Sequence, residues 1–310
     1  MKAFVFPGQG SQKIGMSKDF YDNFQVAKDV FAEVDEALGR KLSSIIFGES
    51  QEELTQTQNA QPALMCASMA MLRVLEKESG KRVEKLCDFV AGHSLGEYSA
   101  LCAAGAFSLS DTAKLLKVRG EAFAEAGKQG GGSMAAIIGV TIKQAEEIAL
   151  RAKEGDEVCQ VANDNTVGQV VISGHESAID RSLEIAKQMG AKRAIKLPVS
   201  GAFHSALMQS AADKVKQALE TVTINEPIIP VIANVSANQV FDAQEIKESL
   251  IAQVTSRVRW REIMLNLESA DVKKIIEIGS GNVLKNMVGR TCEKIEAGSI
   301  CSVESLKEFF

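Results

Sequence analysis

The chain has 310 residues, of which 45% are hydrophobic and 24% are charged, a composition typical of a soluble globular protein. Its formal net charge of −5 excludes a general attraction to nucleic acid or to an anionic membrane. Its six cysteines lack metal-ligand spacing and no apolar run approaches the length of a membrane span, so we expect a reduced, cytoplasmic protein without a metal.

The first expected element is a buried strand, Lys2–Phe6, which reaches a Pro-Gly turn too soon to be the apolar core of a signal peptide. The loop after it does not match nucleotide-binding motifs. Gly8 and Gly10 begin a dinucleotide fingerprint, but the next required glycine is replaced by Lys13, and no Walker pattern is present. The loop is either an ordinary turn or one that supplies a backbone N–H to a neighbouring site.

Two long helices are expected next, over residues 19–38 and 61–78. The second is expected to start at Gln61, with Pro62 in its first turn, where the missing backbone N–H is tolerated. The methionines of this helix lie on its apolar face and indicate a packed core rather than a ligand site.

The clearest motif is Gly92-x-Ser94-x-Gly96, which lies between an expected strand at 86–91 and an expected helix at 97–104. So tight a turn requires glycine on both sides, and the serine hydroxyl then projects at a helix N-terminus that stabilises negative charge. The pattern indicates that Ser94 is a nucleophile. The alternative is a glycine-rich turn with an inert serine.

A helix capped by Ser110 is expected over 110–126. Its inward face includes Leu116, Arg119 and Phe123, which are three and four residues apart. A buried guanidinium needs an anionic partner, because burying it alone is very unfavourable. Arg119 therefore either forms a salt bridge within the chain or binds a carboxylate of the substrate through two parallel hydrogen bonds.

A glycine-rich segment at 127–132 is expected to link two domains. The elements after it follow the order strand, helix, strand, strand, helix, strand, which is typical of a ferredoxin-like domain. They are expected at 133–140, 141–153, 158–162, 168–173, 176–189 and 194–199, with an Asn-Asp-Asn turn after the second strand. The sequence predicts an inserted domain at 128–198 and a discontinuous larger domain formed by 1–127 and 199–310.

Three histidines limit the search for a general base. His93 adjoins Ser94 and is expected to point to the opposite side of the turn, while His175 lies in the small domain. By elimination, His204 is the candidate base, at the start of a helix expected over 205–219. The remaining expected elements are strands at 227–235 and 274–278 and helices at 243–254 and 260–269.

A series of motifs occurs in fixed order along the chain: Gly8-Gln9-Gly10-Ser11-Gln12, Gln61-Pro62-Ala63, Gly92-His93-Ser94-Leu95-Gly96-Glu97, Arg119-Gly120, Gly168-Gln169-Val170-Val171 and Ala202-Phe203-His204. Together they resemble the motifs of malonyl-CoA:acyl carrier protein transacylases, from residue 4 to about residue 284. The resemblance implies an α/β fold with an α/β-hydrolase-like core, built on a parallel sheet, and an inserted ferredoxin-like subdomain. It also implies a free-standing enzyme of dissociated fatty acid synthesis.

The resemblance assigns roles to the matching positions. Ser94 would be the nucleophile, His204 its base, and Arg119 the group that holds the malonyl carboxylate. The backbone N–H groups of Gln9 and Leu95 would form the oxyanion hole.

Further positions match family motifs near the substrate. A carbonyl associated with Gln253, rather than a carboxylate, would orient His204. His93, Phe203 and Gln61 are expected at the substrate, and Phe203 is similar to the residue that malonyl-selective members carry before the histidine.

The implied reaction moves a malonyl group from malonyl-CoA to acyl carrier protein through a serine ester, without a cofactor or a metal. We expect a monomer with no nucleic acid or membrane partner. Acyl carrier proteins are acidic, so this negatively charged chain needs a local basic surface. Candidates near the end of the small domain are Lys187, Lys192, Arg193 and Lys196, which alternatively form a solvated face.

Three other functions stay open at this point. A serine esterase or thioesterase would use the same turn but would have no need of the inward Arg119. A non-catalytic module that binds acyl groups or a carrier protein would form no acyl-enzyme. An acyltransferase of polyketide synthesis would differ chiefly in its acyl preference.

Overall fold

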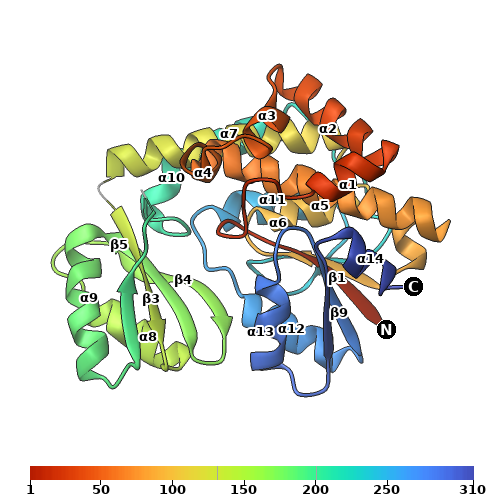
Figure 1. Cartoon of the computed structure of the whole chain (residues 1–310). Coiled ribbons are helices and arrows are strands. Elements are labelled where there is room, and N and C mark those ends of the chain that lie inside the picture. Colours follow the sequence, from red (N-terminus) through yellow and green to blue (C-terminus); the bar gives the residue numbers. More distant parts are fainter. Residues whose placement is uncertain (131, 200) are drawn as a thin grey trace.

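The computed structural model describes residues 1–130, 132–199 and 201–310, which fold around two β-sheets (Figure 1). The larger sheet has the strand order β10-β9-β1-β2-β7-β8, in which β8 alone runs antiparallel to its neighbour. Its strands are β1 (Lys2–Phe6), β2 (Phe89–Gly92), β7 (Val231–Ile232), β8 (Gln239–Val240), β9 (Lys274–Ile278) and β10 (Glu296–Ile300).

Helices cover both faces of this sheet, which explains why its central strands are apolar throughout. In β1, Phe4 and Phe6 enter one hydrophobic core, while Ala3 and Val5 enter the other. The second core contains the helices α12 (Trp260–Ser269) and α13 (Val283–Thr291). The first contains α1 (Lys18–Asn23), α2 (Gln25–Leu38), α3 (Leu42–Ile46), α4 (Gln51–Thr55), α5 (Thr57–Ser79), α6 (Gly96–Ala103), α7 (Leu109–Gly130), α10 (Gln209–Leu219), α11 (Ala243–Gln253) and α14 (Val303–Lys307).

The smaller sheet is antiparallel, with the strand order β4-β5-β3-β6. Its elements occur in the expected order β3 (Gly132–Ile138), α8 (Ile142–Arg151), β4 (Cys159–Thr166), β5 (Gln169–His175), α9 (Glu176–Gln188) and β6 (Arg193–Lys196). This sheet and its two helices bury a separate hydrophobic core. The predicted α/β fold class is confirmed, and the domain boundaries stay a prediction. Two short 3₁₀ helices, Val83–Lys85 and Ala206–Met208, complete the elements of the described ranges.

Several element boundaries differ from those expected in the larger domain. The helix expected at 19–38 is broken at Phe24, whose extended backbone turns its ring onto the core beside Phe20. The helix expected from Gln61 begins at Thr57 instead. The sequence did not indicate this first turn, because it buries polar residues and so lacks the apolar pattern. Within this turn, the side chain of Gln61 donates to the hydroxyl of Thr57 at 2.9 Å. Because the helix starts at Thr57, Pro62 lies inside it rather than in its first turn.

The next helix also differs at both ends. The hydroxyl of Ser108, rather than of Ser110, accepts the backbone N–H of Asp111 at 3.0 Å. Helix α7 then continues to Gly130, so the segment expected as a linker is helical in its first four residues. Gly131 lies outside the described residues.

Two further expectations fail nearer the site. The Asn-Asp-Asn sequence at 163–165 lies within β4 rather than in a turn, because residues of the larger domain bind the buried side chains of Asp164 and Asn165. His204 does not start a helix: its φ is 59°, and α10 begins at Gln209 after a 3₁₀ turn. Ser200 lies outside the described residues. The elements α13, β10 and α14 were not expected from the sequence.

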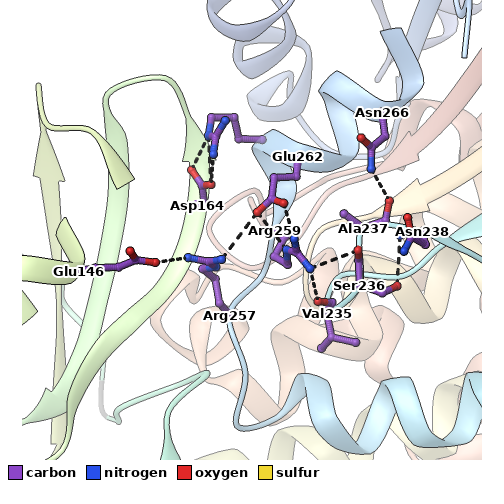
Figure 2. Close-up of polar contacts among 11 residues, drawn as sticks. Glu146, Asp164, Val235, Ser236, Ala237, Asn238, Arg257, Arg259, Glu262 and Asn266 are labelled. Carbon is purple, nitrogen blue, oxygen red and sulfur yellow. Dashed lines mark hydrogen bonds and ion pairs between the residues drawn. The ribbon is translucent and has the colours of Figure 1, made fainter. Parts of the chain in front are cut away.

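The two domains are joined along β4 by the segment that leads from α11 to α12. The main chain of Val258 donates to Ala162 O at 2.8 Å and accepts from Asp164 N at 2.9 Å. The fully buried carboxylate of Asp164 accepts hydrogen bonds from Arg261 at 2.8 and 3.0 Å. Figure 2 shows this junction, where Arg257 also reaches Glu146 of α8 at 2.8 Å.

Gln160 of β4 ties the small domain to the loop that carries His204. Its side-chain nitrogen donates to the main-chain oxygens of His204 and Thr255, both at 3.3 Å. Its side-chain oxygen accepts from Ala206 N at 3.2 Å. The position of His204 therefore depends on both domains. Within the described ranges, no helix has the length and apolar character that a bilayer span requires.

Candidate active site

Ser94 lies on a turn that only glycine neighbours permit. Its φ of 55° is in the left-handed region, between the end of β2 and the start of α6. A Cβ on Gly92 would lie 1.8 Å from Gly96 O, and a Cβ on Gly96 would lie 2.3 Å from Phe6 O. The hydroxyl consequently stands at the N-terminal end of α6, as a nucleophile elbow requires.

Replacing Gly92 with alanine is expected to destabilise the fold by about 3 kcal/mol or more, because main-chain atoms surround the added methyl group. Denaturant unfolding would measure the loss. Gly289→Ala provides the control: no atom lies within 4 Å of its added Cβ, inside α13, and a gain of about 0.5–1 kcal/mol is expected. Equal stability of Gly92→Ala and the native chain would contradict the tight turn.

His204 contacts both the candidate nucleophile and a carbonyl that orients it. Its Nε2 lies 2.8 Å from Ser94 Oγ, and its Nδ1 lies 2.8 Å from the main-chain oxygen of Gln253. A carbonyl only accepts, so Nδ1 carries the proton and Nε2 is free to accept one from the serine. The arrangement has the geometry of a nucleophile–base pair whose orienting group is a neutral carbonyl.

Burial and the charge of Arg119 lower the pKa of His204 from 6.5 to about 3. The imidazole is thus neutral, and competent as a base, throughout the neutral range. We expect kcat/KM for acylation, which reports the free enzyme, to show no loss centred near pH 6.5 when measured between pH 5 and 8. A halving of kcat/KM at pH 6.5 that disappears in a His204 variant would contradict this environment.

Arg119 is buried on the inner face of α7, with a relative exposure of 1%. Its guanidinium donates to Ser94 Oγ at 3.0 Å, to Gln61 Oε1 at 2.6 Å and to Gln253 Oε1 at 2.9 Å. The centre of the Phe123 ring, one turn along the helix, lies 4.2 Å from the guanidinium carbon, within the range of a cation–π contact.

No carboxylate of the described residues forms an ion pair with Arg119, and its Nε has no hydrogen-bond partner among them. The alternative of a structural salt bridge is therefore wrong for this part of the chain. A guanidinium held only by neutral oxygens beside a nucleophile is suited to receive a carboxylate from a ligand.

The loop after β1 packs directly on the serine turn. A Cβ on Gly8 would lie 2.6 Å from His93 O, so the two segments are in close contact. Within the described residues, the backbone N–H groups of Gln9 and Leu95 have no hydrogen-bond partner. The side chain of Gln9 is held by Thr57, whose hydroxyl donates to it at 2.9 Å. Both N–H groups are therefore free to donate to a further group.

The three remaining candidates do not all face the reaction centre. His93 turns towards the small domain, with its Nε2 2.8 Å from Asn165 Oδ1, and burial lowers its pKa. Gln61 acts through Arg119, since its oxygen accepts from that guanidinium. Phe203 lies beside the site, with its ring 5.1 Å from that of Phe123.

Sequence reasoning missed Asn234, which follows β7 and holds the serine turn in place. Its Oδ1 accepts from Ser94 N at 2.8 Å, and its Nδ2 donates to Gly92 O at 2.7 Å. No local pattern indicates this residue, because its partners lie 140 and 142 positions away in the sequence. Phe123 could have been found, since it falls one turn after Arg119 on the same apolar face. Among the residues described, no cluster of metal-ligating side chains is present.

Comparison with known proteins identifies the family. Residues 3–307 match the acyl transferase domain family. The malonyl CoA-acyl carrier protein transacylase of Bacillus subtilis is 46% identical over 305 residues, which cover 98% of this chain and 95% of the relative. The chain belongs to the malonyl-CoA:acyl carrier protein transacylase family. The transacylase of Escherichia coli K12 is 39% identical over 298 residues, covering 96% of this chain and 95% of the relative.

Solved structures of transacylases share the fold over nearly the whole chain. The acyl-carrier-protein-S-malonyltransferase of Bartonella henselae is 52% identical, with a TM-score of 0.95 and coverage of 99% and 97% of the two chains. A malonyl-transacylase solved with a holo acyl-carrier protein of type II polyketide synthesis is 37% identical, with a TM-score of 0.95 and coverage of 99% and 98%. The family and the enzyme class expected from the motifs are confirmed: the chain is an acyltransferase.

Proposed function

We propose that the chain transfers a malonyl group from malonyl-CoA to the pantetheine thiol of acyl carrier protein, through a malonyl ester on Ser94, in fatty acid biosynthesis. The observation that carries this proposal is the buried guanidinium of Arg119, 3.0 Å from the nucleophile and without a carboxylate partner in the described chain. In this proposal the enzyme is a cytoplasmic monomer that uses no cofactor besides its two substrates.

In the first half-reaction, His204 Nε2 takes the proton of Ser94 Oγ as this oxygen attacks the thioester carbon. The carbonyl oxygen becomes an oxyanion, which accepts from the N–H groups of Gln9 and Leu95. Collapse of the tetrahedral intermediate breaks the carbon–sulfur bond. The departing sulfur of coenzyme A takes the proton from His204, which leaves a malonyl ester and a neutral imidazole.

The second half-reaction repeats these steps with a new nucleophile. His204 takes the proton of the pantetheine thiol as its sulfur attacks the ester carbon, and the same N–H groups hold the oxyanion. The carbon–oxygen bond to Ser94 then breaks, and the serine oxygen recovers the proton. Arg119 holds the malonyl carboxylate through both steps, which selects the diacid and places the ester for attack.

Of the four basic residues suggested for carrier docking, two keep a free positive charge within the described part of the chain. Lys187 pairs with Glu184, and Lys196 pairs with both Glu176 and Asp180, so their charges are neutralised locally. Lys192 and Arg193 form no ion pair with another described residue. We retain these two for the acidic carrier, through complementary charge.

The proposed transfer is tested by following the acyl group after it leaves coenzyme A. Radiolabelled malonyl-enzyme, freed of coenzyme A by gel filtration, is mixed with buffer, holo acyl carrier protein or the apo carrier, which lacks the thiol. We expect label on the holo carrier alone. Equal release of free malonate in all three mixtures would indicate a thioesterase, and absence of a labelled enzyme would indicate a binding module.

A further inference from the structure

Glu97 is a buried acid in the site to which the reaction steps above give no role. It lies in the first turn of α6, three residues after Ser94, with a relative exposure of 1%. Its Oε2 accepts from Gln253 Nε2 at 2.7 Å and from the main-chain N–H of Asn234 at 3.0 Å. Burial raises the pKa of this carboxyl to about 7, an effect that both hydrogen bonds and the charge of Arg119 oppose. Through its two hydrogen bonds, Glu97 connects Gln253 and Asn234, both of which contact the reaction centre.

The first connection sets which end of the Gln253 amide faces Arg119. Because Glu97 Oε2 also accepts from the main-chain N–H of Asn234, it is an acceptor, and the NH₂ end of the Gln253 amide must point to it. The oxygen end must then point the other way, where it accepts from Arg119 at 2.9 Å. If the amide turned over, its NH₂ group would face the guanidinium, donor against donor. The same residue orients His204 through its main-chain oxygen, and its NH₂ group also donates to Ser94 O at 3.0 Å.

The second connection supports the nucleophile turn. The main-chain N–H of Asn234 is held by Glu97, while the Asn234 side chain holds Ser94 N and Gly92 O. Glu97 thus anchors the residue that clamps the strained serine and the residue that carries the acceptor of Arg119.

We propose that Glu97 is a positioning residue that fixes the amide orientation of Gln253 and thereby holds Arg119 in place for the malonyl carboxylate. This inference rests on the proposed function, because it specifies how selectivity for a carboxylated acyl group is maintained. It predicts that loss of the acid impairs acylation by malonyl-CoA more than acylation by acetyl-CoA, since an acetyl group has no carboxylate for Arg119 to bind.

The test compares acylation by malonyl-CoA and by acetyl-CoA in Glu97→Met. Methionine is similar in length to glutamate but offers no oxygen to Gln253, so Ser94 O alone is left to accept from the NH₂ end of that amide. We expect kcat/KM for malonyl-CoA to fall by up to about 10²-fold, as for other small misplacements of a binding group, and the malonyl-to-acetyl ratio to fall at least about tenfold. An unchanged ratio would overturn the proposal.

Glu277→Met is the matched control. Glu277 is also a fully buried glutamate whose pKa burial raises to about 7, but it lies in β9 and accepts from Lys285 N at 2.9 Å. The same chemical change there is expected to lower stability without changing the malonyl-to-acetyl ratio. A similar fall of the ratio in both variants would show a general effect of destabilisation and overturn the assignment to Glu97.

Gln253→Met tests the same connection from its other side and decides the matter if Glu97→Met does not fold. It keeps the main-chain oxygen at His204 but removes the acceptor at Arg119, so the ratio is expected to fall again. The double variant is expected to be no worse than the poorer single one, because both break one connection. Additive losses would contradict the proposal. Absence of acylation in the native chain would instead refute the proposed function.

Discussion

Replacing His204 with alanine is expected to slow acylation of Ser94 by malonyl-CoA by about 10²- to 10⁴-fold, the usual contribution of a general base. The imidazole lies 2.8 Å from Ser94 Oγ as a proton acceptor, and Gln253 O holds it in the tautomer that accepts the proton. Stopped-flow or quenched measurement of acyl-enzyme formation would give the rate constant directly. Discharge of the ester to the carrier thiol is expected to slow by a similar factor, since both half-reactions use this base.

His175→Ala is the matched control for this substitution. The Nδ1 of His175 accepts from Val158 N at 2.8 Å in the small domain, and no contact joins it to Ser94 in the described chain. Its removal is expected to leave the acylation rate constant within about twofold of the native value. A His204→Ala enzyme that acylated as fast as His175→Ala would remove His204 from the mechanism.

Arg119→Ala is expected to lower kcat/KM for malonyl-CoA by about 10²-fold or more. Two hydrogen bonds from a guanidinium to a carboxylate contribute about 1.5–3 kcal/mol each, and the variant loses both. The rate with acetyl-CoA is expected to stay the same or to rise, because removal of the positive charge also relieves the depression of the His204 pKa. The malonyl-to-acetyl ratio is the quantity to measure.

Arg119→Lys separates charge from geometry. Lysine keeps the positive charge but cannot form the planar pair of hydrogen bonds, nor stack in the same way on Phe123. An intermediate ratio is expected. Equal malonyl rates in Arg119→Ala and the native chain would show that another group holds the carboxylate.

The residues that sequence analysis placed correctly are those whose requirement is local. The serine turn needs glycine at fixed offsets because main-chain atoms meet there, so Gly92 and Gly96 mark Ser94 in any context. Arg119 was found because three- and four-residue spacing places it on an apolar face, and the structure buries it there. His204 required elimination among three histidines, which a chain richer in histidine would not have allowed.

The features that were missed depend on contacts distant in sequence. Asn234 and Glu97 are 137 positions apart, and neither occupies a position that a periodic pattern would indicate. The residues at 163–165 favour a turn by composition, but Arg261 and His93 supply partners that keep them in β4. Helix α5 begins before its apolar pattern because the site itself buries polar side chains such as Thr57.

The site depends on residues from both domains, and Gln253 connects its parts. Its main chain orients the base, its amide oxygen holds Arg119, and its NH₂ group reaches both Glu97 and Ser94 O. The segment after Gln253 continues directly to the pairing with β4. A substitution that disturbs this residue should therefore affect nucleophile, base and carboxylate binding together.

The central claim is that malonyl transfer passes through an ester on Ser94, and intact-protein mass spectrometry tests it most directly. The native chain and Ser94→Ala are mixed briefly with malonyl-CoA, and holo acyl carrier protein is then added. The account predicts a malonyl adduct on the native chain alone, which disappears as the carrier gains the same mass. A malonyl adduct on Ser94→Ala, or a malonylated carrier formed by that variant at the native rate, would contradict it.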